Sequence, residues 1–367
     1  MKVYCEGLDL VDAVQKVIKA ASNKTINPIL EGIKITAEDD TLTFVATDSE
    51  LAIEKKIKAD VKIEGETVVP GKFFSEFVKK LANEQVELDL NEKNQLKIKY
   101  TDSEVTIQCF NSIEYPTIQK IDNAQFFTIS QANFKDLIEK TIFSVALDDS
   151  RPILKGCLYE IDEKEITSVA LDGFRLALAK YPILEQTARV SVIVPGRSLN
   201  EINKLLDDTD ENIRVFIQRN YLMVQINNTK IITRLIDGDF INYRQILNDN
   251  FNTVITVNKL QLENSLDRAS ILGRMSNDNI IKLMIKENVL TLFSSSEIGN
   301  VTEKINIVQN GQDLTICFDS RFLKDCLRAV KDEFIKLCFT TSVNPCIIKA
   351  NDGENYMFLV LPLKQFT

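Results

Sequence analysis

Val69-Pro70-Gly71-Lys72 returns 125 residues later as Val194-Pro195-Gly196-Arg197, and this repetition is the main indication of how the chain folds. Two other stretches return at almost the same interval. Ile29-Leu30-Glu31-Gly32 is echoed 124 residues later by Ile153-Leu154-Lys155-Gly156, and Ala46-Thr47-Asp48 is echoed 124 residues later by Ala170-Leu171-Asp172. A weaker third copy is marked by Phe318-Asp319-Ser320-Arg321.

A repeat of roughly 120 residues has the length of a domain, whereas solenoid units span about 20–50 residues. Three such copies fill the 367 residues almost completely. We therefore predict three similar domains, at residues 1–123, 124–250 and 251–367. Linkers are expected near Asp122-Asn123-Ala124 and from Asn248 to Asn252, because these segments are polar and lack a hydrophobic pattern.

Each copy reads as two similar halves, each with a helix followed by strands. Apolar residues recur at helical spacing through 10–21, and the segments 33–37 and 41–46 read as strands with Asp39-Asp40 as their hairpin turn. The pattern predicts an α+β fold in which every domain packs two helices on antiparallel sheets. The other five helices are expected at Phe73 to Leu81, Phe134 to Ser144, Leu199 to Leu206, Leu260–Leu272 and Phe322–Val330.

The composition is that of an ordinary globular chain, with 44% hydrophobic and 26% charged residues. No apolar run of about 18 residues occurs, which argues against a membrane span or a signal peptide and predicts a cytoplasmic protein. Seven cysteines form no C-x-x-C pair. Buried, reduced thiols are the favoured interpretation over disulfides or a metal site.

The chain contains no histidine. Ser-His-Asp and Cys-His nucleophiles, the usual zinc sets and the commonest general base are therefore absent. Carboxylate or lysine chemistry stays possible, but the sequence has no phosphate-binding glycine loop and no compact acidic cluster. We therefore predict a non-enzyme with no catalytic residue, no metal and no cofactor.

The distribution of charge differs between the helices and the rest of the chain. The net charge is −9, yet the windows 11–24, 71–83, 133–141, 196–206, 258–274 and 320–331 hold 17 Lys and Arg against 8 Asp and Glu. One interpretation is that helix surfaces are simply rich in lysine. The other is a basic face offered to a polyanion, with phosphate contacts that ignore base sequence because no base-reading motif is present.

Several short stretches together resemble the bacterial DNA polymerase III β subunit family, the sliding clamps. They are Asn27-Pro28-Ile29-Leu30, the run from Ala170 to Ala177, Val194 to Leu199, Leu235 to Arg244 and Leu361-Pro362-Leu363-Lys364. The resemblance covers the whole chain in order. It implies three clamp domains per chain and two chains joined head to tail in a ring, with helices lining the hole and sheets forming the outer wall.

The resemblance also implies residues that contact DNA and the second chain. Lys24, after the first helix, and Arg197, at a helix start, are candidates for touching the duplex, together with Lys72, Lys79 and Lys204. An exposed lysine without a partner is the alternative for each. Ile271 and Leu272, at the end of a third-domain helix, are expected to face Val105 and Ile107 on an edge strand of the partner. The alternative is that Ile271 and Leu272 are core.

A pocket for short linear peptides is implied between the second and third domains. The implied partners are the replicative DNA polymerase α subunit, the clamp loader, repair polymerases and ligase. Phe174, Ile241, Asp319 and Phe322 depart from the family pattern of histidine, proline, asparagine and tyrosine, so the pocket is expected to be more apolar and slightly more acidic. The alternatives are ordinary core for the leucines and a surface ion pair for Arg151 and Arg175. The predicted wall comprises Arg151, Leu154, Gly173, Phe174, Arg175, Leu176, Ile241, Ile246, Asp319, Phe322, Val343, Leu359, Leu361, Pro362 and Leu363.

The predicted function is that of a processivity clamp which encircles duplex DNA, tethers replication proteins and has no activity of its own. An alternative from another class is a clamp-like scaffold that binds peptides but is not loaded on DNA. An enzyme using carboxylates or lysine is a third. Retention on circular DNA separates the first two, and an acidic pair in a pocket away from the ring would favour the third.

Overall fold

The computed structural model describes residues 1–22, 25–122, 124–148, 150–247, 249–276 and 279–363. They fall into two compact units. The first comprises Met1–Gln131, Glu185–Thr187 and Glu201–Leu235, and the second comprises Ala132–Leu184, Ala188–Asn200 and the chain from Ile236 onward. These units differ from the three sequence repeats because two of the sheets continue from one repeat into the next.

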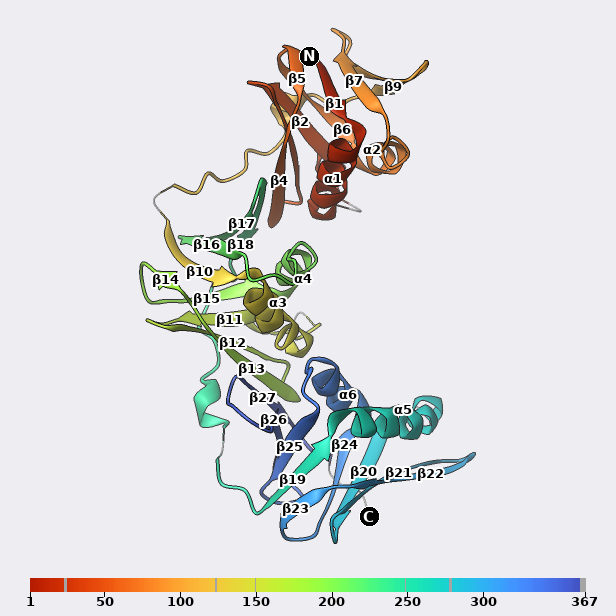
Figure 1. The fold of residues 1–367 in the computed structure, drawn as a ribbon, viewed down its shortest axis with the longest axis vertical. Helices are drawn as coiled ribbons and strands as arrows, with labels where there is room; N and C mark the ends of the chain where they lie inside the picture. The colour runs from red at the N-terminus through yellow and green to blue at the C-terminus, as the bar shows by residue number, and fades with distance from the viewer. Residues whose placement is uncertain (23–24, 123, 149, 248, 277–278, 364–367) are drawn as a thin grey trace. The chain divides into compact units, whose positions relative to one another are not determined.

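The N-terminal repeat lies wholly in the first unit and has two helices, α1 (Gly7–Val17) and α2 (Gly71–Val78) (Figure 1). Its strands fall into two sets, which we name after the half that supplies most of each set: β1 and β5 join the second-half strands, and β6 joins the first-half strands. The second-half strands form a five-stranded sheet in the order β5-β1-β7-β8-β9. These strands are β1 (Lys2–Glu6), β5 (Asp60–Ile63), β7 (Gln85–Leu90), β8 (Gln95–Tyr100) and β9 (Ser103–Gln108). Its first-half strands are β2 (Gly32–Glu38), β3 (Thr41–Thr47), β4 (Leu51–Lys58) and β6 (Gly65–Pro70).

The first-half strands continue into the middle repeat. Strand β4 pairs with β18, giving a nine-stranded sheet in the order β14-β10-β16-β17-β18-β4-β3-β2-β6. The middle repeat supplies β10 (Gln125–Ser130), β14 (Glu185–Gln186), β16 (Asn212–Gln218), β17 (Tyr221–Ile226) and β18 (Thr229–Arg234). All nine strands belong to the first unit.

A second nine-stranded sheet joins the middle and C-terminal repeats within the second unit, in the order β15-β11-β12-β13-β27-β26-β25-β19-β23. The middle repeat supplies β11 (Gly156–Ile161), β12 (Glu165–Leu171), β13 (Arg175–Pro182) and β15 (Val190–Pro195). The C-terminal repeat supplies β19 (Thr253–Asn258), β23 (Val308–Gly311), β25 (Phe334–Phe339), β26 (Cys346–Ala350) and β27 (Tyr356–Val360).

The remaining strands of the C-terminal repeat form a four-stranded sheet in the order β22-β21-β20-β24. They are β20 (Ile280–Lys286), β21 (Val289–Ser296), β22 (Gly299–Asn306) and β24 (Leu314–Asp319). The long helix α5 (Lys259–Ser276) packs on β21 and β22, and α6 (Ser320–Arg328) packs beside α5 (Figure 1). The middle repeat has the helices α3 (Gln131–Glu139) and α4 (Gly196–Asn203).

Six short 3-10 helices complete the described elements: η1 (Ile18–Ala20), η2 (Pro28–Glu31), η3 (Ser112–Glu114), η4 (Ile142–Ser144), η5 (Pro152–Lys155) and η6 (Tyr243–Gln245). The predicted α+β class with six α-helices is confirmed. All seven cysteines are free and buried, as predicted. Within the described residues, no helix is long and apolar enough to cross a membrane.

Close packing explains the repeated Pro-Gly motif. A Cβ added to Gly71 would lie 2.5 Å from the carbonyl oxygen of Glu31, and one added to Gly196 would lie 3.2 Å from that of Lys155. Glu31 and Lys155 occupy the same place in the repeated Ile-Leu-Xaa-Gly motif. The two sequence motifs are therefore contact partners, and glycine lets the second helix of the repeat begin against the backbone of η2 or η5.

Local signals gave correct turns but imprecise helix ends. Asp39 and Asp40 have φ of 47° and 55° and form the predicted hairpin turn. The helix predicted from Phe134 to Ser144 instead begins at Gln131, ends at Glu139 and is followed by η4. The Thr141 hydroxyl donates to the Leu137 carbonyl at 2.8 Å and lies 2.9 Å from the Ser168 hydroxyl, so a tertiary contact competes with helix continuation. The helix predicted to end at Leu272 runs on to Ser276.

Candidate functional sites

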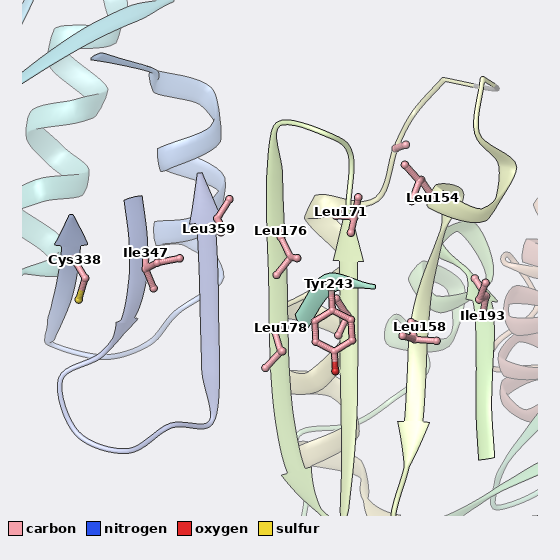
Figure 2. Packing of buried hydrophobic residues seen from close by; sticks show 12 residues of the cluster. Leu154, Leu158, Leu171, Leu176, Leu178, Ile193, Tyr243, Cys338, Ile347 and Leu359 are labelled. Atoms are coloured by element: carbon pink, nitrogen blue, oxygen red, sulfur yellow. The ribbon is translucent and has the colours of Figure 1, made fainter. Parts of the chain in front are cut away.

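An apolar cluster lies on one face of the second nine-stranded sheet (Figure 2). Leu176 on β13 and Leu359 on β27 stand directly opposite each other where the middle and C-terminal repeats meet. Because side chains alternate along a strand, they point away from the face that carries Ala177 and Phe358. The buried members of this cluster are Ala146, Leu154, Leu158, Val169, Leu171, Leu176, Leu178, Ile193, Tyr243, Cys338, Ile347 and Leu359.

The predicted pocket divides into a floor and an exposed rim. Leu154, Leu176 and Leu359 are buried in the cluster, and Ile241 packs against it. The core interpretation of these leucines is therefore correct, and a ligand can meet them only as a floor. Around the floor, 57% of Phe174 and 37% of Leu361 are exposed. Arg151, Gly173, Ile246 and Val343 are exposed as well, and Pro362 and Leu363 are half-buried.

Arg175 is held inside the protein, where the pocket prediction expected it at the rim. Its guanidinium pairs with Asp172 at 3.0 Å and with Asp325 at 2.6 Å, and only 10% of its side chain is exposed. It also lies 4.8 Å from the centroid of the Phe322 ring and 5.4 Å from that of Phe143. Arg175 therefore joins β13 to α6 and η4, and a ligand carboxylate would have to displace two existing partners.

The loop before Arg175 is equally constrained. The Asp172 carboxylate accepts from the backbone amides of Phe174 and Arg175 at 2.9 and 3.0 Å. Gly173 has a φ of +93°, which an L side chain rarely adopts. The Phe174 ring stacks on the Phe322 ring with centroids 5.8 Å apart and planes at 19°. Phe174 and Phe322, which both depart from the family pattern, thus form one preformed aromatic wall.

Asp319 is occupied by its own helix. It is buried, caps the start of α6 by accepting from the Arg321 amide at 2.9 Å, and pairs with the Arg321 guanidinium at 2.6 Å. The Arg321 guanidinium neutralises the charge, so the expected extra acidity of the pocket is reduced. Burial raises the pKa of the Cys326 thiol on the same helix, which keeps it protonated and unreactive.

The chain after β27 is fixed by its backbone. The Leu361 amide donates to the Phe174 carbonyl at 2.9 Å, and the Leu363 amide donates to the Cys317 carbonyl at 2.8 Å. These bonds place the Leu361–Leu363 segment between β13 and β24. The side chain of Leu361 can therefore change without loss of the backbone bonds that hold the segment.

Two equivalent strand junctions differ at one residue pair on this face, although Ala52 and Ile232 are buried in an apolar cluster at the first junction as well. In the first unit, Glu54 on β4 faces Lys230 on β18, and the two form an ion pair at 3.4 Å. Leu178 stands 124 residues after Glu54 and faces Met357 in the second unit. A charged pair in one junction is thus replaced by an apolar pair in the other. This substitution marks the second junction as the better site for an apolar ligand.

The predicted DNA-contacting residues differ in the ion pairs that the structure gives them. Lys72 and Lys79 are exposed on α2 and at its C-terminal cap, and they form no ion pair within the described part of the chain. Arg197 is exposed at the second position of α4. Lys204 pairs with Glu201 at 2.7 Å. Lys24 lies outside the described residues.

Ion pairs reduce the basic surplus that the sequence predicted for the helices. Among the described residues, at least nine of the 17 basic residues in the six windows bind carboxylates. Seven of these nine pairs use acidic residues of the windows themselves, and only Arg268 and Arg321 bind acids outside them, Glu303 on β22 and Asp319 on β24. These nine are Lys16, Lys140, Lys204, Lys259, Arg268, Arg321, Lys324, Arg328 and Lys331.

The predicted dimer residues lie beside two sheet edges. In the described residues, β9 pairs only with β8, and β22 pairs only with β21. Ile107 is buried and Val105 is half-buried on β9. On α5, 55% of Ile271 is exposed, so the core alternative is wrong for Ile271, and Leu272 is half-buried. The exposed Phe73 on α2 was not predicted, because one phenylalanine in a helical apolar pattern looks like a core residue.

Comparisons with known proteins agree along the whole chain. Models of the DNA polymerase III beta subunit match in succession, with its N-terminal domain over residues 1–119, its central domain over 128–242 and its C-terminal domain over 244–364. A Beta sliding clamp of Bacillus subtilis is 33% identical over 378 residues and both chains are covered completely. One from Staphylococcus epidermidis is 31% identical, with 97% of each chain covered.

Solved structures give the same result. The crystal structure of the DNA polymerase sliding clamp from Bacillus subtilis has a TM-score of 0.97 at 31% identity, and both chains are covered completely. That of a putative DNA polymerase III beta subunit from Eubacterium rectale has a TM-score of 0.95 at 30% identity, again over both complete chains.

Proposed function

Because this chain belongs to the DNA polymerase III beta subunit family, we propose that it closes head to tail with a second copy around duplex DNA and holds partner proteins through short peptides. The protein is a sliding clamp, a replication processivity factor without catalytic activity of its own. Its site residues, its named partners and its place on the nucleoid in the cytoplasm are proposals. We keep 1–123, 124–250 and 251–367 as its domain boundaries.

Topology, with only weak phosphate contacts, is proposed to hold the clamp on DNA. Lys72 on α2 and Lys79 at its C-terminal cap are exposed and form no ion pair within the described residues, which suits contacts to a DNA backbone that looks alike at every base pair. Once loaded, the protein should remain on nicked circular DNA and run off when the circle is linearised. Gel filtration of the loaded complex before and after cutting measures this. Equal retention on both forms would contradict the clamp and favour another mode of binding.

The two lysines give a second prediction. Lys72→Ala together with Lys79→Ala should weaken binding to a random-sequence duplex, and the slope of log K against log salt should become shallower by about 0.9 for each phosphate that is no longer bound. Fluorescence anisotropy over a salt series measures both. Lys93→Ala with Lys120→Ala is the matched control, since these residues are exposed in the same unit and the change in charge is equal. The assignment fails if both double variants shift alike.

The peptide site is proposed at the junction of β13 and β27. What supports it is the apolar face of Leu176, Leu178 and Leu359, together with the exposed rim of Phe174 and Leu361. Peptides with aliphatic or aromatic anchors fit such a surface. We propose that the replicative DNA polymerase α subunit, the clamp loader, repair polymerases and ligase take turns at it.

The number of strands supports closure of the dimer. Each internal junction joins four first-half strands to five second-half strands in a sheet of nine. A four-stranded sheet with the edge β22 and a five-stranded sheet with the edge β9 are left over. Pairing β22 with β9 of the partner subunit would complete the same arrangement and cover both edges, and two copies of this heterologous contact close a dimer.

A further inference from the structure

We propose that β22 and β9 of the partner subunit meet in one register, with Val301 opposite Val105 of the partner subunit. We also propose that the exposed Phe73 of α2 packs against Ile298 of the partner subunit. This inference rests on the proposed head-to-tail dimer and adds its register and an aromatic contact. Two junctions within the chain, β4 with β18 and β13 with β27, show the register that we expect for β22 with β9 of the partner subunit.

The equivalence of first-half positions follows from the strand pairs. Val68, Ile193 and Cys317 each stand three residues before the helices α2, α4 and α6. Each of these residues is connected to the last strand of its set through residues that face each other on successive strands. This connects Val68 to Glu54 on β4, Ile193 to Leu178 on β13 and Cys317 to Thr302 on β22. The preceding residues, Ile53, Ala177 and Val301, are therefore equivalent as well.

Second-half positions are matched in the same way. Val3, Phe127 and Ile255 each stand four residues before the helices α1, α3 and α5. Residues that face each other on successive strands connect Val3 to Val105 on β9, Phe127 to Ile231 on β18 and Ile255 to Phe358 on β27. These three end residues are therefore equivalent.

Both internal junctions use the same register. Ile53 faces Ile231 in the first unit, and Ala177 faces Phe358 in the second. A backbone bond recurs too, since the Arg234 amide donates to the Glu50 carbonyl at 2.8 Å and the Leu361 amide donates to the Phe174 carbonyl at 2.9 Å. Val301 is equivalent to Ile53 and Ala177, and Val105 is equivalent to Ile231 and Phe358. The same register between β22 and β9 of the partner subunit therefore places Val301 opposite Val105 of the partner subunit.

Aromatic side chains from the helical segments make contacts across the junction of β13 and β27. Phe143 contacts Phe358 edge to face at 5.3 Å, and Phe322 stacks on Phe174. Ile271 follows the start of α5 by as many residues as Phe143 follows the start of α3, and Phe73 has the same place in α2 as Phe322 in α6. The template therefore brings Ile271 to Val105 of the partner subunit, and Phe73 to Ile298 of the partner subunit.

Exposure agrees with this assignment. In the single chain 47% of Phe73 and 67% of Ile298 are exposed, although both are large and apolar. Phe73 is also part of a rigid aromatic row, stacked on Phe77 at 5.9 Å, with Phe77 edge to face on Tyr100 at 5.8 Å. A fixed aromatic ring and an exposed isoleucine that meet at an interface would both be removed from water.

Cysteine cross-linking of the full-length chain tests the register. Val105→Cys with Val301→Cys should give a covalent dimer under mild oxidation, because residues directly opposite at a position without mutual hydrogen bonds have Cα atoms about 4.5 Å apart. Ser103→Cys with Val301→Cys is the control, because it is displaced by two residues on the same face, where diagonal neighbours are about 7–8 Å apart. Non-reducing gels should show at least fivefold more dimer for the first pair.

The outcomes separate the register from the dimer itself. If light scattering shows a dimer but the displaced pair cross-links better, the register is wrong and the proposed function stands. If the wild-type chain is a monomer at micromolar concentration, both the dimer and this inference are overturned.

Phe73→Asp tests the aromatic contact. It should raise the dimer dissociation constant at least tenfold while circular dichroism stays that of the wild type. Leu184→Asp is the matched control, because Leu184 is similarly exposed but belongs to neither free edge. If Phe73→Asp and Leu184→Asp dimerise as tightly as the wild type, the contact between Phe73 and Ile298 of the partner subunit is excluded.

Discussion

Ile271→Asp is expected to convert the dimer into a folded monomer of 41.7 kDa. In the single chain 55% of Ile271 is exposed, so aspartate costs little there, but in the proposed dimer the carboxylate would be desolvated without a partner. Such burial costs several kcal/mol, and about 2.7 kcal/mol already weakens association by about a hundredfold. Sedimentation equilibrium measures the dissociation constant, and thermal unfolding checks the fold of the monomer.

Leu260→Asp provides a control on the same helix. Leu260 is also exposed on α5 but lies 11 residues before Ile271, which is about 16 Å along the helix axis. The control should remain dimeric. Leu272→Asp is a less clean test, because Leu272 is half-buried within its own subunit. A dimeric Ile271→Asp variant would show that the interface lies elsewhere, and an unfolded one that Ile271 supports its own domain.

Leu361→Ala with Leu363→Ala is expected to weaken the binding of a peptide from the replicative polymerase α subunit at least tenfold. The two amides of this segment are held by the Phe174 and Cys317 carbonyls, so the backbone should stay in place while apolar surface is removed. A buried CH₂ contributes about 0.8 kcal/mol, and tenfold needs about 1.4 kcal/mol. Removal of two such groups from the interface therefore suffices.

The control for the pocket uses exposed apolar residues elsewhere. Leu184→Ala with Val308→Ala removes similar side chains from loop and edge positions of the same unit and should leave the affinity unchanged. Isothermal titration calorimetry measures the affinity for the peptide, and light scattering should show an intact dimer for both double variants. Unchanged affinity for Leu361→Ala with Leu363→Ala would move the peptide site away from this segment.

Local sequence patterns predicted much of the fold because their causes are local. Asp39 and Asp40 form the expected turn since short polar residues tolerate positive φ. The repeated Pro-Gly stretch marks a helix start in both copies because Gly71 and Gly196 pack against backbone. Helix ends were less accurate, as with Thr141, whose hydroxyl binds Leu137 and lies beside Ser168 on a strand remote in sequence.

Charges and site residues were harder to predict, because their partners are distant along the chain. Arg175 seemed to be a rim residue, yet Asp325, 150 residues away, holds it inside the protein. Arg268 added to the basic count of a helix, but Glu303 on β22 pairs with it. No local pattern reveals such partners.

The repeated motifs were enough to predict a threefold repeat of helices and antiparallel strands, and other short motifs indicated the family. The pairing of strands between one repeat and the next could be read only from the folded chain. That pairing made one junction apolar, through Leu178 and Met357, and the other charged, through Glu54 and Lys230. Among the described strands, it also left β9 and β22 as edges available to a partner. Helix and turn preferences act over a few residues, whereas strand pairing between repeats joins residues more than a hundred positions apart, so no local pattern could predict it.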